Sequence, residues 1–265
     1  MAKKQVIRGA VVSHKGCERG NNEDNFFFNG DLMLLADMDQ GAYIVQEFDD
    51  ANQLYAVCDG MGGANLGERA AYISARQMVN FSASFASGSV SQNIEKFANQ
   101  ISQMVAEDAR KNNARIEGST LAMAAIVKQT LYVANVGDSR VYRLRGGELQ
   151  QLSDDHSEVN RMRAAGLLTE EQARKAANSN VITRYIGMDE KKRPADFAYQ
   201  SKHTLAAGDR IMICSDGVSD LLSKAQMEEL MKNASSPEEA ARVLVMSALE
   251  LGGKDNTTAV VLEVK

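Results

Sequence analysis

The stretch "LYAVCDGMGGANLGERAA" (residues 54–71) places a carboxylate directly after an apolar run. The first five residues are typical of a buried strand, Asp59 follows at the strand end, and three glycines stand among the next four residues. An alanine-rich segment with a helical pattern comes next. Burial penalises the charged form of a carboxylate, so an aspartate at this place needs a partner. The stretch therefore predicts a strand, a turn and a helix built around something that Asp59 binds.

Three more stretches carry an aspartate at a strand end beside a turn. They are "RIMICSDGVSDLL" with Asp216, "VANVGDSRVYRL" with Asp138 and "GGKDNTTAVVLEV" with Asp255. Carboxylates that gather repel one another, whereas hard divalent cations such as Mg²⁺ or Mn²⁺ bind them readily. A single Asp-Gly pair is ordinary turn chemistry, but its recurrence at strand ends favours a metal centre. Gly60 is the best candidate for a carbonyl ligand, because a residue without Cβ lets the backbone approach an ion.

The segment "CERGNNEDNFFF" (residues 17–28) adds Glu23 and Asp24 immediately before a predicted strand. Arg19 precedes them, and the planar fork of an arginine matches the oxygens of a phosphate group. An arginine close to a metal cluster therefore indicates a bound phosphoryl group. The alternative for Arg19 taken alone is a solvated surface charge.

Composition excludes several classes of protein. The chain has 265 residues, 44% hydrophobic and 25% charged, without a Pro/Ser-rich linker, and we expect one domain over residues 1–265. A net charge of −5 with scattered Lys and Arg argues against nucleic-acid binding. The three cysteines have no metal-ligand spacing and favour a reducing compartment. Without an apolar span or leader pattern we expect a cytoplasmic, monomeric protein with no membrane partner.

The apolar runs predict strands that are mostly not joined by crossover helices, which favours antiparallel pairing and an α+β fold over a doubly wound parallel sheet. Residues 31–51 hold two further candidate strands separated by "DMDQG". Helices are expected from about Asn65, and over residues 91–112, 224–232 and from the cap Ser236 onward. The predicted strands are Val6–Val12, Leu54–Cys58, Leu121–Val127, Leu131–Val136, Arg210–Cys214 and Thr258–Val264.

Eight stretches in order resemble the metal-dependent protein phosphatases of the type 2C family, in the form typical of bacterial members. The resemblance extends from about residue 6 to residue 264, nearly the whole chain. The stretches are "RGNNEDN", "VCDGMGGANLGE", "GSTLA", "VANVGDSRVYRL", "LSDDHS", "VITRYIG", "CSDGVSD" and "KDNTTAVVLEV".

The resemblance implies a four-layer α-β-β-α sandwich of two antiparallel sheets flanked by helices, with a small flap at about residues 157–177. It implies two Mg²⁺ or Mn²⁺ ions, with room for a third, at one end of the sandwich. The implied reaction is hydrolysis of phosphoserine and phosphothreonine in proteins by a water or hydroxide that bridges the two ions. The implied role in signal transduction is to oppose a bacterial Ser/Thr kinase. The alternatives are a phosphatase-like regulator of one dedicated partner, or a binding module without chemistry.

Residue by residue, the resemblance assigns most of the acidic positions to metal. Asp59 matches the aspartate that bridges both ions and is central to catalysis, and Gly60 matches the residue that offers its carbonyl. Asp216 and Asp255 match two further ligands.

The remaining positions carry less definite roles. Glu23 and Asp24 match the acidic pair of the family, without an indication of which one binds metal directly. Asp138 matches a ligand of the third, weaker ion of bacterial relatives, and Arg19 matches the phosphate-binding arginine.

The general acid is left open by the sequence. Many eukaryotic relatives have a histidine where this chain has Met61, and methionine cannot donate a proton. His156 in "DDHS" is either an acid or a structural residue.

Overall fold

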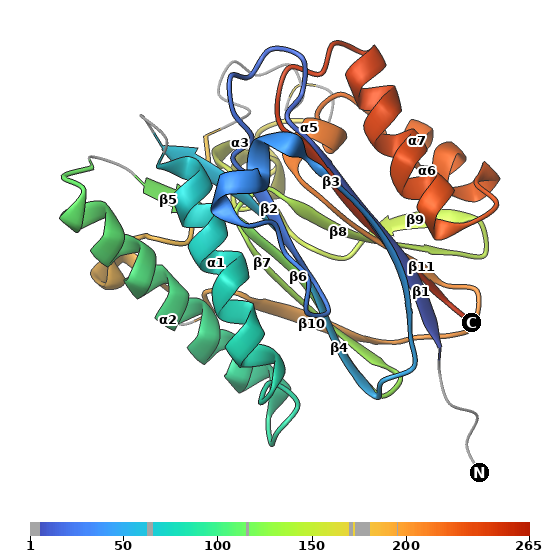
Figure 1. The fold of residues 1–265 in the computed structure, drawn as a ribbon, viewed down its shortest axis with the longest axis horizontal. Helices are drawn as coiled ribbons and strands as arrows, with labels where there is room; N and C mark the ends of the chain where they lie inside the picture. Colours follow the sequence, from blue (N-terminus) through green and yellow to red (C-terminus); the bar gives the residue numbers. More distant parts are fainter. Residues whose placement is uncertain (1–5, 63–65, 115–116, 170–171, 173–180, 195) are drawn as a thin grey trace.

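The structure, a computed structural model, contains two sheets stacked face to face with a helical pair outside each (Figure 1). The pair α1 (Gly67–Ser82) and α2 (Val90–Lys111) covers one sheet. The pair α6 (Lys224–Asn233) and α7 (Pro237–Glu250) covers the other. The expected α+β sandwich of antiparallel sheets is confirmed. The structure describes residues 6–62, 66–114, 117–169, 172, 181–194 and 196–265.

The sheet under α6 and α7 has six strands in the order β3-β1-β12-β11-β8-β9, and each neighbouring pair is antiparallel. Its central strand β12 is buried along almost its whole length, so it reads as a continuous apolar run. The strands are β1 (Ile7–His14), β3 (Ala42–Phe48), β8 (Arg140–Arg145), β9 (Glu148–Gln151), β11 (Arg210–Cys214) and β12 (Thr257–Val264).

The second sheet runs in the order β10-β7-β6-β4-β2, and the short strand β5 pairs with the end of β4. The inner faces of the two sheets share one large apolar core that includes Phe26, Phe28 and Tyr55. The strands are β2 (Asp24–Phe28), β4 (Asn52–Gly62), β5 (Glu117–Ser119), β6 (Leu121–Val127), β7 (Thr130–Val136) and β10 (Tyr199–Thr204).

One local prediction is wrong. Residues 31–51 contain one strand, β3, and a 3-10 helix at Leu35–Gln40 instead of a second strand. That helix ends at Gly41, which has a φ of +71° and donates its N–H to the carbonyl of Met38.

The helix caps follow the sequence closely. Ser236 accepts a hydrogen bond from the backbone N–H of Glu239, and Pro237 occupies the first turn of α7, as expected. Ser223 and Gln226 form a reciprocal capping box at the start of α6. Both helices of this pair therefore have defined beginnings.

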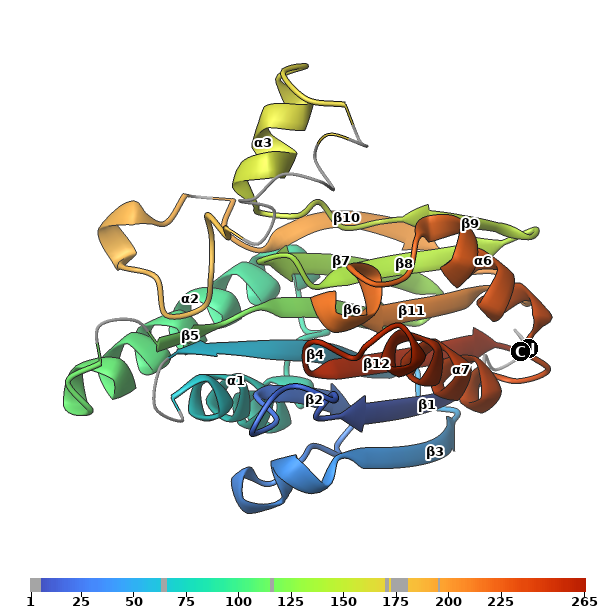
Figure 2. The ribbon, with the colours of Figure 1, turned by 90° about the horizontal axis from the view of Figure 1, so that it is seen from above.

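The expected flap is described only in part. Its first helix, α3 (Glu158–Ala164), projects from the body of the molecule beyond β10 (Figure 2), and Ser157 caps it. Further along, the N–H of Thr169 donates to the Gln172 side chain and the N–H of Gln172 donates to the Thr169 hydroxyl. Residues 170–171 and 173–177 of the expected flap, like the expected helix start at Asn65, lie outside the described residues.

No helix within the described ranges is both long enough and apolar enough to cross a membrane. The expectation of one domain over residues 1–265 stays a prediction.

Candidate active site

The strand pairing brings the predicted aspartates to one end of the sandwich. Asp24 begins β2 and Asp59 lies near the end of β4, and because these strands are antiparallel the two residues are direct partners in the ladder. Asp216 follows the end of β11 and Asp255 precedes the start of β12, which is the antiparallel neighbour of β11. Four segments far apart in the sequence therefore deliver carboxylates to one region.

Asp24 is fully buried and held by the other sheet. Its Oδ2 accepts a hydrogen bond of 2.8 Å from the hydroxyl of Ser215, and the same hydroxyl oxygen accepts from the backbone N–H of Thr258 at 3.0 Å. The Thr258 hydroxyl is 2.8 Å from that of Ser13. This buried chain of hydroxyls fixes the Asp24 carboxylate between the two sheets.

Asp59 is held through its backbone. Its N–H donates to the Thr120 hydroxyl at 2.9 Å, and its carbonyl accepts from the Thr120 N–H at 2.8 Å. The Thr120 hydroxyl also lies 2.7 Å from that of Ser139, one residue after Asp138. The backbone position of Asp59 is thus tied to the turn that carries Asp138.

These carboxylates perturb one another strongly. Burial raises the pKa of Asp59 well above its usual value, and the charges of Asp24, Asp216, Asp138 and Asp255 raise it further. The pKa of Asp216 is raised well above its usual value by burial and then by Asp138 and other neighbouring aspartates. Burial raises the pKa of Asp24 to about 7. The protein alone cannot keep all of them ionised at neutral pH, so the cluster calls for positive charge.

Two oxygens of the cluster have no partner in the described chain. They are Oδ1 of Asp24 and Oδ1 of Asp216, and both are buried. A buried acceptor without a hydrogen bond is costly, and a bound cation is one way to satisfy it. Within the described ranges, no three His, Cys, Asp or Glu side chains form a ready-made metal cage. The donor set suits hard ions that keep several waters of their own.

Arg19 lies against this cluster. Its guanidinium donates to Oδ2 of Asp255 at 2.6 Å, and the nearby charges of Glu23 and Asp59 add to the rise in its pKa. About half of the Arg19 side chain and a third of that of Asp255 are exposed, at 51% and 32%. A positively charged, anion-binding fork therefore stands at the solvent-facing rim of the carboxylates.

Gly60 is required by close packing of backbone. A Cβ at this position would come within 2.1 Å of the Gly67 carbonyl oxygen and 2.7 Å of the Glu23 carbonyl oxygen. Gly67, the first residue of α1, in turn lies against the Glu23 carboxyl group, since a Cβ there would be 2.7 Å from its Cδ. The half-buried Glu23 therefore sits at the N-terminus of α1, where the helix dipole favours negative charge.

Asp138 faces a separate polar cavity of about 240 Å³ beneath α3. Burial raises the pKa of Asp138 to about 6, Asp155 and Asp220 raise it too, and Arg140 lowers it. Arg140 is bound bidentately by Asp155, which offsets its charge. The coupling of Asp138 to both Asp59 and Asp216 places it beside the main cluster.

His156 is engaged with the backbone of Gly137. Its backbone N–H donates to the Gly137 carbonyl, and its ring Nδ1 accepts from the Gly137 N–H at 3.3 Å. Burial, followed by the charge of Arg184, lowers the pKa of His156 to about 4. The ring is therefore neutral at physiological pH and binds the loop that carries Asp138. These properties favour a structural role for His156 over a role as the general acid.

Comparisons with known proteins place the chain in a family. Residues 20–257 match the family model described as protein phosphatase 2C. The chain belongs to the protein phosphatase 2C family. The expected family and enzyme class, a phosphoprotein phosphatase, are confirmed.

Individual relatives agree with this assignment. The chain is 30% identical over 226 residues to the serine/threonine phosphatase stp of Listeria welshimeri, a match that covers 83% of this chain and 87% of that protein. The crystal structure of the Mycobacterium tuberculosis serine/threonine phosphatase PstP/Ppp superimposes with a TM-score of 0.78 at 27% identity, covering 97% and 98% of the two chains. A PstP catalytic domain in complex with two manganese ions gives a TM-score of 0.79 at 27% identity, covering 98% and 99%.

Several residues of this candidate site were not assigned a role by sequence reasoning. Ser215 and Thr258 anchor Asp24, and Asn256 accepts the backbone N–H of Glu23 at 2.8 Å while its amide donates to the carbonyls of Lys15 and Asn21. Each of them lies inside a quoted motif near its aspartate, which is the only signal that the sequence offers. Most of their contacts join segments about 190 to 240 residues apart, so spacing alone could not reveal them.

Proposed function

We propose that this chain is a metal-dependent protein serine/threonine phosphatase whose site is the carboxylate cluster around Asp59. The observation that carries the proposal is the mutual rise in the pKa of Asp24, Asp59 and Asp216, two of which keep a buried oxygen without a partner. Such an arrangement is stable in its ionised form only with bound cations. Membership of the family indicates the class of reaction, and the carboxylate cluster can bind the cations that this reaction requires.

Asp59, Asp216 and Asp255 are the proposed carboxylate ligands of two Mg²⁺ or Mn²⁺ ions, with the Gly60 carbonyl as a further ligand. The two manganese ions of the PstP catalytic domain support this number. Bound ions of this kind lower the pKa of a water molecule and offset the negative charge of a phosphoryl group. Asp138, beside the main cluster, is the proposed ligand of a third ion.

Asp24 and Glu23 have different surroundings, which supports different duties for them. Asp24 is fixed by Ser215 and has no exposed surface, so it sets the negative charge at the base of the site. Glu23 is half-buried against the start of α1 and can shift to accept a hydrogen bond from a water of the site. We assign both to the metal site on these grounds.

Arg19 is the proposed phosphate-binding residue. Without a cation its guanidinium pairs with Asp255, a proposed ligand. Once the charge of Asp255 is shared with an ion, the Arg19 fork is available to two oxygens of the substrate phosphate. Arg19 thereby orients the phosphoryl group and holds it against the site.

Proton transfer to the leaving group does not use Met61 or His156. Met61 has no acidic proton, and His156 is neutral with Nδ1 already occupied by Gly137. The serine or threonine product then takes its proton from water or from another group of the site.

The substrate class follows from the relatives, which are named serine/threonine phosphatases. We propose phosphoserine and phosphothreonine proteins as substrates and a Ser/Thr kinase as the opposing enzyme. Phosphate release from phosphoserine, phosphothreonine and phosphotyrosine peptides, measured with EDTA, Mg²⁺ or Mn²⁺, tests this directly. We expect hydrolysis of the first two only with a divalent ion. Turnover that persists in EDTA would contradict the proposal.

A further inference from the structure

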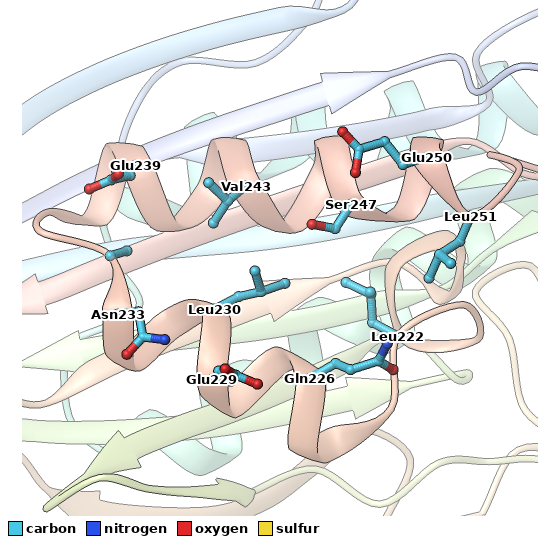
Figure 3. Close-up of a pocket in the computed structure, with 11 residues that line it drawn as sticks. Leu222, Gln226, Glu229, Leu230, Asn233, Glu239, Val243, Ser247, Glu250 and Leu251 are labelled. Atoms are coloured by element: carbon cyan, nitrogen blue, oxygen red, sulfur yellow. The ribbon is translucent and has the colours of Figure 1, made fainter.

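A groove between α6 and α7 stands outside the catalytic cluster. It encloses about 390 Å³ between one face of each helix (Figure 3). Leu230 and Val243 face each other across its middle, and Leu222 and Leu251 lie together at one end. Leu251 is 49% exposed, so part of this apolar lining is open to water. Exposed apolar surface in a concave site is typical of a docking surface.

The rim of the groove is acidic. Glu229, Glu239 and Glu250 line it, and no Lys or Arg is among its lining residues. The Glu239 carboxylate already accepts hydrogen bonds from Ser235. Within the described chain, Glu229 and Glu250 have no hydrogen bond or ion pair through their carboxylates. Two free negative charges therefore flank an apolar floor, which favours a partner with apolar side chains between basic ones.

The end of the groove lies next to the catalytic cluster. Leu222 follows Asp216 by six residues, and Leu251 precedes Asp255 by four. Leu222 also lines the polar cavity that contains Asp138, so it forms a wall between that cavity and the groove. A segment bound in the groove with its end at Leu222 and Leu251 would hold the rest of its chain close to the site.

We propose that the α6–α7 groove docks a basic amphipathic helix of the phosphoprotein substrate. The groove takes the apolar face of that helix, as grooves between helices commonly do, and Glu229 and Glu250 pair with its Lys or Arg residues. Docking raises the local concentration of the phosphorylated residue at the carboxylate cluster. This inference rests on the proposed phosphatase function, because it names how the substrate of that same site is recruited.

Two synthetic peptides test the recruitment. One carries phosphothreonine, a flexible Gly-Ser linker and a Leu/Lys amphipathic helix of about 15 residues, a length at which helices become stable. The other ends after the linker. We expect the helix to raise kcat/KM by at least about tenfold for the wild-type protein. Because this ratio compares two substrates of one enzyme, it does not depend on the absolute activity of a variant.

Matched charge reversals locate the effect. In E229K/E250K the ratio should fall to about one, whereas in E148K/E190K, which makes the same change of net charge at exposed positions outside the groove, it should be kept. An equal fall in both variants, or no gain from the helix in the wild-type protein, overturns the inference.

Binding of the helix alone separates this inference from the proposed function. Fluorescence anisotropy of the labelled, unphosphorylated helix needs no turnover, and we expect saturable binding that E229K/E250K weakens at least tenfold relative to E148K/E190K. If the wild-type protein with Mn²⁺ does not hydrolyse para-nitrophenyl phosphate, the proposed function is contradicted. The binding result stays valid, because binding needs no turnover. Absence of saturable binding, or equal binding by both variants, overturns the docking site.

Discussion

Asp24 and Asp59 are direct cross-strand partners on β2 and β4, so two carboxylates face each other at the buried end of a sheet. Like charges in this relation are destabilising, and here burial adds to the cost. The pairing makes sense if the folded protein stores this repulsion and a cation relieves it.

Replacing Asp59 by Asn should abolish the reaction without unfolding the protein. Asn keeps the backbone hydrogen bonds with Thr120 but removes the central negative charge. We expect kcat for a phosphothreonine peptide with Mn²⁺ to fall at least about a hundredfold, with an unchanged circular dichroism spectrum. D50N, at an exposed position between β3 and β4, is the control and should keep full activity. Near-normal turnover by D59N would remove Asp59 from the site.

Stability of the metal-free protein should depend on Asp24 and on pH. The folded pKa of Asp24 is about 7 against a usual value of 3.8, so the folded state binds the proton more tightly than the unfolded state. The free energy of unfolding therefore falls as pH rises from about 4 to about 7, and this loss should be smaller in D24N. His156 acts in the opposite direction, because its folded pKa is lowered to about 4.

The measurement is the difference in thermal midpoint between D24N and wild type in EDTA, at pH 5 and at pH 8. Since His156 is common to both proteins, its contribution cancels. We expect D24N to gain roughly 5 °C relative to wild type on going from pH 5 to pH 8. A difference that stays constant with pH would show that Asp24 does not carry the repulsion.

Replacing Arg19 by Ala should weaken phosphate binding more than chemistry. Charge-assisted hydrogen bonds to phosphate are lost while the carboxylates stay in place. We predict a KM about tenfold higher for a phosphopeptide, with kcat changed far less. R19K, which keeps the charge without the fork, should lie between R19A and wild type. If steady-state kinetics give the wild-type KM for R19A, Arg19 is a surface charge after all.

Ser215 is predicted to be a positioning residue for Asp24. S215A removes the donor at 2.8 Å from Oδ2 and leaves a buried carboxylate without its partner. We expect a loss of about 1–3 kcal/mol in the free energy of unfolding and about a tenfold rise in the Mn²⁺ concentration for half-maximal activity. A purely structural role would change stability alone. S87A, at an exposed loop position, should change neither quantity.

The sequence was sufficient for most of the sheet framework. The predicted strands Leu121–Val127 and Arg210–Cys214 have the same bounds as β6 and β11, because both are buried apolar runs between clear turns. The predicted second strand around Leu35 was wrong, because a short apolar segment does not distinguish a strand from a 3-10 helix. Gly41 decided the outcome through a backbone conformation that no periodicity encodes.

The acidic residues of the candidate site were predicted from the sequence. The residues that hold those carboxylates in place were not. An aspartate after an apolar run is conspicuous, whereas Ser215 and Thr258 look like ordinary strand-end residues until both sheets are assembled. The separate surroundings of Glu23 and Asp24 likewise follow from the packing of α1 against β4, which adjacency in the chain cannot show.

The most direct test is calorimetric titration of the metal-free protein with Mn²⁺, with wild type and D59N compared under the same conditions. The account predicts that wild type binds at least two ions per chain, the number in the PstP catalytic domain, and that D59N loses at least one of them. A D59N titration that superimposes on that of wild type, or a wild type that binds no Mn²⁺, would contradict it.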